Sequence, residues 1–318
     1  MSDVRRYRAY GVVVASDIDV PEFLPWDDRG PEAAGPPLSI RLGRVPERLP
    51  GAVGDAYFQA CPDAFVLNVE GVARYLVRDG TDIVIEPAAD ASEHDVRVYL
   101  LGSCMGGVLH QRGLLVLHAS AIATTSGATL LCGHSGVGKS TLLGELLRRG
   151  CCMLVDDVCA IAIDDAGRPV AHPAYPRTRL WADAATVLGR DVTALPRTQP
   201  GMDKYELQVP EHYWSEPAAV RHIYVLTIGE RDSLSLKALP VVDRFSALLH
   251  HTYRREFLEA LAMQPRHFRL ASTVARAVPM TRVIRPAAPF RLAELADLIE
   301  GDMDGSDASP LRQDASTH

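Results

Sequence analysis

The chain has 318 residues, of which 47% are hydrophobic and 23% are charged, and its formal net charge is −7. This composition is typical of a globular protein and excludes a disordered or fibrous chain. The excess of acidic residues argues against a general nucleic-acid-binding protein and against adhesion to an anionic membrane.

Two features of the sequence concern its compartment. No stretch reaches the roughly 18 uninterrupted apolar residues of a transmembrane helix, and the apolar run before Asp17 is too short for a signal-peptide core. The six cysteines form no C-x-x-C pair, which is typical of small buried side chains in a reducing compartment. We therefore expect a cytoplasmic protein.

Residues 1–95 are expected to form a small β-rich domain. Turn residues such as Asp79-Gly80 separate its five apolar segments, which are residues 7–15, 38–42, 64–69, 73–78 and 81–85. Residues 94–111 carry apolar side chains at helical spacing and predict one helix leading into a second domain.

Residues 96–300 are expected to form an α/β domain, because strand-like and helix-like segments alternate there. The strands are predicted at residues 114–123, 128–132, 151–155, 158–163, 223–228 and 281–284. Helices are predicted at residues 140–149, 243–263 and 292–300. The remainder, residues 301–318, carries aspartates among serine, glycine and proline and is expected to be a disordered acidic tail.

The strongest motif is G-x-x-x-x-G-K-[ST], which a predicted strand precedes and a predicted helix follows. It comprises Gly133, His134, Ser135, Gly136, Val137, Gly138, Lys139 and Ser140, followed by Thr141. The glycines let successive N–H groups point at phosphate oxygens, and the helix N-terminus adds its dipole. Lys139 can reach the β- and γ-phosphates, and the Ser140 hydroxyl can ligate Mg²⁺. The motif predicts a nucleotide site, without separating a kinase from an ATPase or a GTPase.

An acidic pair and a histidine accompany the loop in the sequence. Asp156 and Asp157 follow a buried strand, 16 and 17 positions after Ser140, so they are expected at the sheet edge beside the loop. Neighbouring strand residues point to opposite faces, so one acid can serve a metal and the other can accept a proton from an attacking hydroxyl. His118 precedes Gly133 by 15 positions, and a two-stranded hairpin would return it to the loop.

Together, His118, the loop at 133–140 and the pair Asp156-Asp157 resemble the catalytic domain of HPr kinase/phosphorylase. The resemblance covers about residues 112–165 and implies an HPr-kinase-type P-loop fold with ATP and Mg²⁺ as cofactors. It also implies that Asp157 is the general base for a seryl hydroxyl, that Asp156 supports the metal, and that His118 assists at the phosphate. Residues 1–95 do not resemble the family's regulatory domain, and the chain looks closer to kinases of lasso-peptide precursors.

Four further residues are candidates for contacts at the site. Arg177, Arg179 and Lys204 are predicted in loops after the core strands, where they can hold phosphates or an acidic peptide. Asp183 stands about where the resembled family places a metal-binding glutamate. The pair His250-His251 has no metal-ligand spacing and is expected on a helix surface.

The leading hypothesis is an Mg-ATP-dependent kinase that phosphorylates a serine hydroxyl of a peptide or small protein, including a ribosomal natural-product precursor. A kinase of small metabolites and a non-catalytic ATP-sensing module remain as alternatives. The expected partner is the acceptor peptide or protein, with no nucleic acid and no membrane, and self-association into a homo-oligomer is left open.

Overall fold

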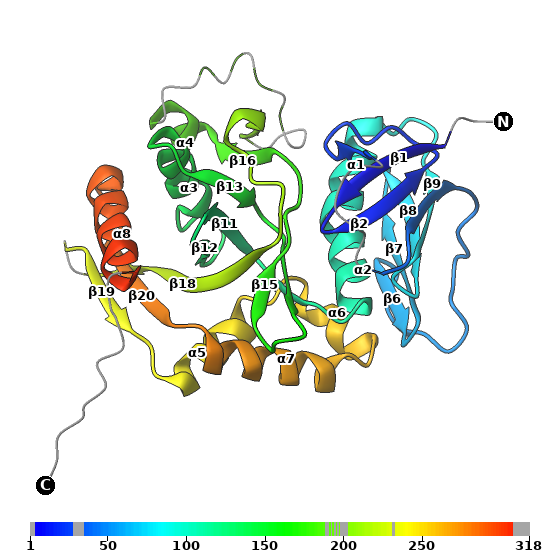
Figure 1. Cartoon of the computed structure of the whole chain (residues 1–318). Coiled ribbons are helices and arrows are strands. Elements are labelled where there is room, and N and C mark those ends of the chain that lie inside the picture. The colour runs from blue at the N-terminus through cyan, green and yellow to red at the C-terminus, as the bar shows by residue number, and fades with distance from the viewer. Residues whose placement is uncertain are drawn as a thin grey trace, which may run out of the picture.

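The computed structural model describes residues 4–27, 35–187, 203–230 and 233–307, together with residues 191, 193, 195 and 197. Over these residues the chain is a mixed α/β protein with two large sheets and a separate two-stranded hairpin (Figure 1).

The first sheet has nine strands in the spatial order β3-β1-β2-β4-β9-β8-β7-β6-β5. They are β1 (Arg5–Ala9), β2 (Val12–Ser16), β3 (Leu24–Pro25), β4 (Leu38–Leu42), β5 (Val53–Gly54), β6 (Phe58–Cys61), β7 (Ala64–Val69), β8 (Ala73–Arg78) and β9 (Asp82–Pro87). The single strand expected at residues 7–15 is instead the hairpin of β1 and β2, because Tyr10 and Gly11 have φ of 53° and 70° and reverse the chain. Asp79 and Gly80 turn the β8–β9 hairpin in the same way, with φ of 52° and 64°.

One helical segment covers a face of the first sheet. It comprises α1 (Glu93–Tyr99), a π-helical stretch (Leu100–Cys104) and α2 (Met105–Gln111). Gly107 allows α2 to approach the sheet, since a Cβ there would lie 2.2 Å from the Phe65 ring. The division of the chain at residue 95 stays a prediction, because a single buried cluster includes apolar side chains of both large sheets.

The second sheet contains β10-β14-β15-β18-β12-β11-β13 in spatial order, with β20 beside β18 and β19 beside β20. Its strands are β10 (Leu115–Leu117), β11 (Ala119–Thr124), β12 (Gly127–Cys132), β13 (Cys152–Val155), β14 (Cys159–Ile163), β15 (Pro169–Ala171), β18 (Ala218–Gly229), β19 (Ser235–Ala238) and β20 (Met280–Pro286). The predicted strand at 114–123 is interrupted at His118, because β10 pairs with β14 whereas β11 pairs with β12 and β13. β12, β18 and β20 are parallel, so their carboxyl ends share one edge.

The hairpin of β16 (Arg177–Trp181) and β17 (Lys204–Gln208) stands beside the second sheet. The remaining helices are α3 (Lys139–Arg148), α4 (Ala182–Val187), a 3₁₀ turn (Pro210–His212), α5 (Val241–His250), α6 (Arg255–Ala260), α7 (Gln264–Ala277) and α8 (Leu292–Asp307). α3 and α8 share a second apolar core with β12 and β18, to which Leu142, Leu146, Leu295 and Ile299 belong.

Two predictions about helices are wrong. The helix expected at residues 243–263 is divided into α5 and α6, because Thr252 pairs with Leu117 and Tyr253 N–H donates to the Val116 carbonyl. The first residues of the expected tail continue α8 as far as Asp307, and residues 308–318 lie outside the described part of the chain.

Among the described residues, none of the helices is both long and apolar enough to cross a lipid bilayer. The cytoplasmic location stays a prediction.

Candidate active site

The loop with the phosphate-binding motif joins β12 to α3, so the strand before it and the helix after it are as predicted. Gly133, Gly136 and Gly138 have φ of 153°, 80° and 102°, a region that strains any residue with a Cβ. Gly138 is also the N-cap of α3, and no side chain caps this helix end. The first amides of α3 therefore stay open for an anion, with the positive end of the helix dipole behind them.

The side chain of Lys139 is folded back onto this loop. Its Nζ donates to the carbonyl oxygens of Gly133 at 2.8 Å and His134 at 3.2 Å, and lies 3.1 Å from His118 Nε2. Burial lowers the pKa of Lys139, and the negative charges of Asp156 and Asp157 oppose this effect. Three acceptors match the three ammonium protons, so Lys139 must exchange some of these contacts to reach a phosphate.

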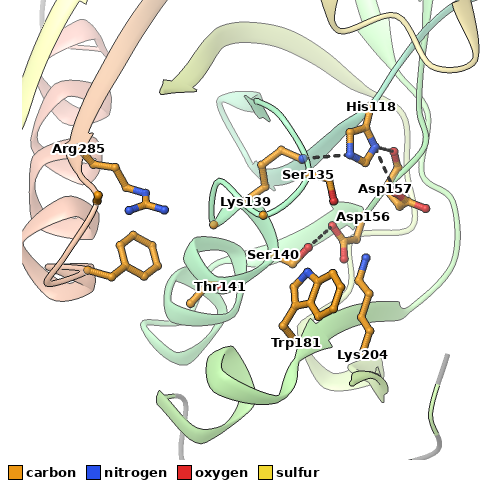
Figure 2. A pocket seen from close by; sticks show the side chains of 14 residues that line it. His118, Ser135, Lys139, Ser140, Thr141, Asp156, Asp157, Trp181, Lys204 and Arg285 are labelled. Carbon is orange, nitrogen blue, oxygen red and sulfur yellow. Dashed lines mark hydrogen bonds and ion pairs between the residues drawn. The ribbon is translucent and has the colours of Figure 1, made fainter. Parts of the chain in front are cut away.

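His118 is the link between Lys139 and Asp157, and it occupies the break between β10 and β11. Its backbone N–H donates to the His251 carbonyl at 2.7 Å, which ties the break to the end of α5. Its Nδ1 lies 3.1 Å from Asp157 Oδ1 and 3.1 Å from the Asp157 carbonyl oxygen. Because both oxygens only accept, Nδ1 carries the proton, and Nε2 is left to accept from Lys139 (Figure 2).

Asp157 lines the same pocket as the loop, and its two carboxylate oxygens contact His118 and Arg179. Its φ of 78° is a left-handed conformation that aspartate tolerates better than most residues. Burial would raise the pKa of Asp157, but the hydrogen bond from His118 and the charge of Arg179, whose Nη1 lies 3.3 Å from Oδ2, outweigh it. The net effect lowers the pKa of Asp157, so this half-buried side chain is ionised and accepts hydrogen bonds.

The Asp156 side chain is buried, and its two carboxylate oxygens accept four hydrogen bonds. Its Oδ1 accepts from Ser120 at 2.6 Å and from Ser140 at 3.3 Å. Its Oδ2 accepts from the Thr178 hydroxyl at 2.7 Å and from the Arg179 N–H at 3.1 Å. Asp156 therefore connects β11, α3 and β16 and holds the Ser140 hydroxyl in place.

The fit of a metal ion depends on Ser140. Because Ser140 gives its proton to Asp156, its lone pairs stay available to a hard cation. The described residues contain no group of three or more His, Cys, Asp or Glu side chains able to hold a metal. A cation at Ser140 thus needs phosphate oxygens and water to complete its shell, as Mg²⁺ commonly does.

These residues line one pocket (Figure 2). Its wall consists of His118, Ser135, Gly136, Gly138, Lys139, Ser140, Thr141, Asp156, Asp157, Trp181, Lys204, Arg285, Ala287 and Phe290. Of the predicted loop residues, Gly133, His134 and Val137 do not line it. The Val137 side chain is buried in the apolar core, and His134 Nε2 lies 2.9 Å from His250 Nε2.

The structure separates the three predicted cations. Lys204 lines the pocket, and its Nζ lies 5.9 Å from the centre of the Trp181 ring. Arg179 does not line the pocket, although its Nη1 lies 3.3 Å from Asp157 Oδ2. Arg177 does not reach the pocket: its side chain is 1% exposed and lies between Glu206 and Glu22, because residues 177–181 form a strand and not a loop.

A buried ionic chain continues from Arg177 into the first sheet's layer. Arg177 Nη1 lies 2.7 Å from Glu206 and 3.4 Å from Glu22, and Glu22 in turn lies 2.9 Å from Arg97 Nε on α1. At its other end, Glu206 is 3.8 Å from Arg179, which contacts Asp157. The carboxylate at the loop mouth is thus connected, through alternating charges, to the N-terminal part of the chain.

Two other expectations concern histidines and a metal ligand. Of the pair His250-His251, His250 lies exposed on α5 as expected, whereas His251 is buried, and burial together with electrostatic repulsion from His250 lowers the pKa of His251 to about 3. The side chain of Asp183 lies outside the described residues.

Sequence reasoning missed Trp181, Arg285, Ala287 and Phe290. Strand alternation does not identify Trp181, because Arg177 and Arg179, which share its side of β16, do not line the pocket. Arg285, Ala287 and Phe290 stand at the end of β20, which runs parallel to β12. The rule that ligands bind at the carboxyl ends of parallel strands identifies them only when the order of the strands is given.

Comparisons with known proteins add little to this geometry. No family model matches the chain, and no curated protein matches its sequence. Among solved structures, the chain is similar to the HPr(Ser) kinase/phosphatase from Coxiella burnetii. That match has a TM-score of 0.34 and 13% sequence identity, and it covers 60% of this chain and 94% of the other.

Proposed function

We propose that this chain is a kinase that transfers the γ-phosphoryl group of ATP to a hydroxyl group, with Mg²⁺ at Ser140. The observation that carries the proposal is the hydrogen-bonded line Lys139–His118–Asp157 at the mouth of the phosphate loop. A loop that only binds nucleotide phosphates needs its lysine, but it does not need an ionised carboxylate close to that lysine. Such a carboxylate is what the incoming hydroxyl of a phosphoryl transfer requires.

The loop amides and Lys139 hold the nucleotide phosphates in this mechanism. Lys139 leaves part of its contacts with the loop carbonyls and turns to the β- and γ-oxygens. When bound, Mg²⁺ supplies positive charge to the phosphate oxygens. Asp156 keeps the Ser140 hydroxyl oriented with its lone pairs toward that ion.

Asp157 receives the acceptor hydroxyl. The acceptor oxygen forms a bond to the γ-phosphorus as the bond between this phosphorus and the bridging oxygen breaks, and ADP leaves. The acceptor proton passes to Asp157, whose lowered pKa makes it a weak base. This suits a loose transition state, in which orientation of the hydroxyl matters more than early proton removal. His118 keeps the carboxylate in place through its Nδ1–H.

We further propose that the acceptor is a serine of a peptide or small protein, and that the site is of the HPr kinase type. The order of His118, the loop and the acidic pair supports the type of site. The hairpin of β16 and β17 contributes an exposed aromatic ring, Trp181, and a cation, Lys204, to the wall of the pocket that Asp157 also lines. A peptide with an acidic or aromatic neighbour to its serine would fit this wall.

The experiment compares the wild type with Asp157→Asn and with Asp165→Asn, an exposed turn residue that serves as the control. Radiolabelled γ-phosphate transfer from Mg-ATP is measured on an array of serine-containing peptides and on water, and ATP affinity is measured separately. We expect Asp157→Asn to lose at least about a hundredfold in transfer, the lower range for a lost acid–base group, while ATP still binds.

Transfer that survives in Asp157→Asn contradicts the assigned role. ATP binding by the wild type without transfer to peptides, small hydroxyl metabolites or water contradicts the kinase itself. It would instead favour the ATP-sensing module. Transfer to metabolites alone would keep the kinase and reject the peptide acceptor.

A further inference from the structure

The pocket extends past the phosphate loop on the side away from Asp157. Gly138, Thr141, Arg285, Ala287 and Phe290 line this second part. Figure 2 shows Arg285 on one side of Lys139, and His118 and Asp157 on the other. The proposed transfer uses only the side of His118 and Asp157, so the wall near Phe290 has no assigned role.

This wall is built from fixed groups. Arg285 is 6% exposed, and its Nε and Nη1 donate to the carbonyl oxygens of Val137 at 2.9 Å and Pro286 at 2.7 Å. The guanidinium lies 4.3 Å from the centre of the Phe290 ring. A Cβ on Gly138 would lie 2.8 Å from this ring, so the ring packs directly against the last glycine of the loop. Phe290 is therefore held, half-buried, beside the start of α3.

The direction of a bound nucleotide follows from the two ends of the pocket. The γ-phosphate belongs near Lys139 and Asp157 under the proposed function, on which this step rests. The phosphate chain then runs back past Ser140 and Thr141, so the nucleoside leaves the loop on the Phe290 side. We infer that Phe290, backed by Arg285, is the platform on which the nucleotide base stacks.

The same wall carries few groups that could read the identity of the base. Its described side chains include no Asp, Glu, Asn or Gln, and the carboxylates that line the pocket, Asp156 and Asp157, belong to the phosphate end. Two of the Arg285 nitrogens are already bound to backbone carbonyls. Selective binding of guanine would need an acceptor such as a carboxylate for its N–H groups, whereas stacking accepts any base. The subsite therefore takes adenine and guanine nucleotides with affinities within about tenfold of each other.

The test uses three ligands, ATP, GTP and inorganic tripolyphosphate, the last of which has no base. Each is titrated by calorimetry in the presence of Mg²⁺ against the wild type, Phe290→Ala and Phe290→Trp. Phe268→Ala is the matched control, because Phe268 on α7 is 59% exposed and does not line the pocket.

We expect Phe290→Ala to raise the Kd of ATP and of GTP by about 5- to 150-fold and to leave tripolyphosphate unchanged. Phe290→Trp retains an aromatic ring and should therefore bind ATP and GTP much more tightly than Phe290→Ala does. The control Phe268→Ala should bind all three ligands like the wild type.

Each of the following results would contradict one step of this inference. Nucleotide affinity unchanged in Phe290→Ala removes the base platform while the phosphate site stands. An equal loss for tripolyphosphate means that Phe290 shapes the loop and does not hold the base. A difference above about tenfold between ATP and GTP in the wild type contradicts base tolerance. A wild type that binds none of the three ligands refutes the proposed function and this inference with it.

Discussion

Replacing Arg177 with methionine tests the buried ionic chain most directly. The Arg177 side chain is 1% exposed, and those of Glu206 and Glu22 are 8% and 5% exposed. Arg177→Met keeps the length of the side chain but leaves two buried carboxylates without their shared partner. Breaking a buried ion pair in this way costs about 3–5 kcal/mol of unfolding free energy. Arg97 and Arg179 still lie near the two glutamates, at 2.9 Å and 3.8 Å, so we expect a loss of about 3 kcal/mol.

The measurement is urea unfolding at neutral pH, followed by circular dichroism, for the wild type and two arginine variants. The control is Arg168→Met, whose exposed side chain pairs with Asp164 at 2.8 Å and should contribute at most about 1 kcal/mol.

A double variant separates charge from packing. Adding Glu206→Gln to Arg177→Met removes one of the stranded charges and should recover part of the lost stability. If Arg177→Met unfolds within about 0.5 kcal/mol of the wild type, the chain of charges does not stabilise the fold as we describe. A double variant that is less stable than Arg177→Met would show that packing, and not charge, causes the loss.

Two further predictions concern pH and packing. Burial lowers the pKa of His110 and of His267 to about 4 from the ordinary 6.5, so below pH 6.5 the unfolded chain binds protons that the folded chain does not. As the pH falls from 6.5 to 4, the free energy of unfolding should decrease by up to about 1.4 kcal/mol per pH unit for each histidine. In urea titrations at pH 7 and pH 5, His267→Gln should lose less stability between the two pH values than the wild type. An equal loss in the two proteins would contradict this prediction. Gly107→Ala should lower the thermal midpoint, because overpacking against Phe65 costs about 1–3 kcal/mol. A Cβ on Gly301 of α8 would meet no atom within 4 Å, so Gly301→Ala should raise the free energy of unfolding by about 0.5–1 kcal/mol. Lower stability of Gly301→Ala, or an unchanged thermal midpoint of Gly107→Ala, would refute the packing argument.

The local features of the phosphate site follow from the sequence alone. The glycines, Lys139 and Ser140 are neighbours in the chain, and the left-handed φ values and the helix start depend on these residues themselves. The placement of Asp156 and Asp157 needed only one helix and one strand after the loop. Short-range sterics and one supersecondary unit therefore suffice for this part of the site.

Other features depend on which strands and helices meet. The apolar run around His118 does not reveal the break between β10 and β11. Such a run has the same sequence pattern whether it forms one strand or two strands that pair with different neighbours. The break between α5 and α6 arises because Thr252 pairs with Leu117, far away in the sequence. Neither pairing leaves a periodic signal in the segment that it divides.

Arg177 and Phe290 also show that tertiary contacts determine the surroundings of a side chain where the local sequence pattern does not. The charge of Arg177 and its predicted place in a loop suggested that it faces a ligand, yet two carboxylates from distant segments enclose it. Phe290 gave no motif, yet the parallel pairing of β20 with β18 brings it to the loop. The phosphate loop could be recognised from neighbouring residues because backbone conformation is a short-range property. The position of Phe290 in the pocket wall and the buried charge chain were decided only when remote segments packed together, because burial and ion pairing depend on what surrounds a side chain.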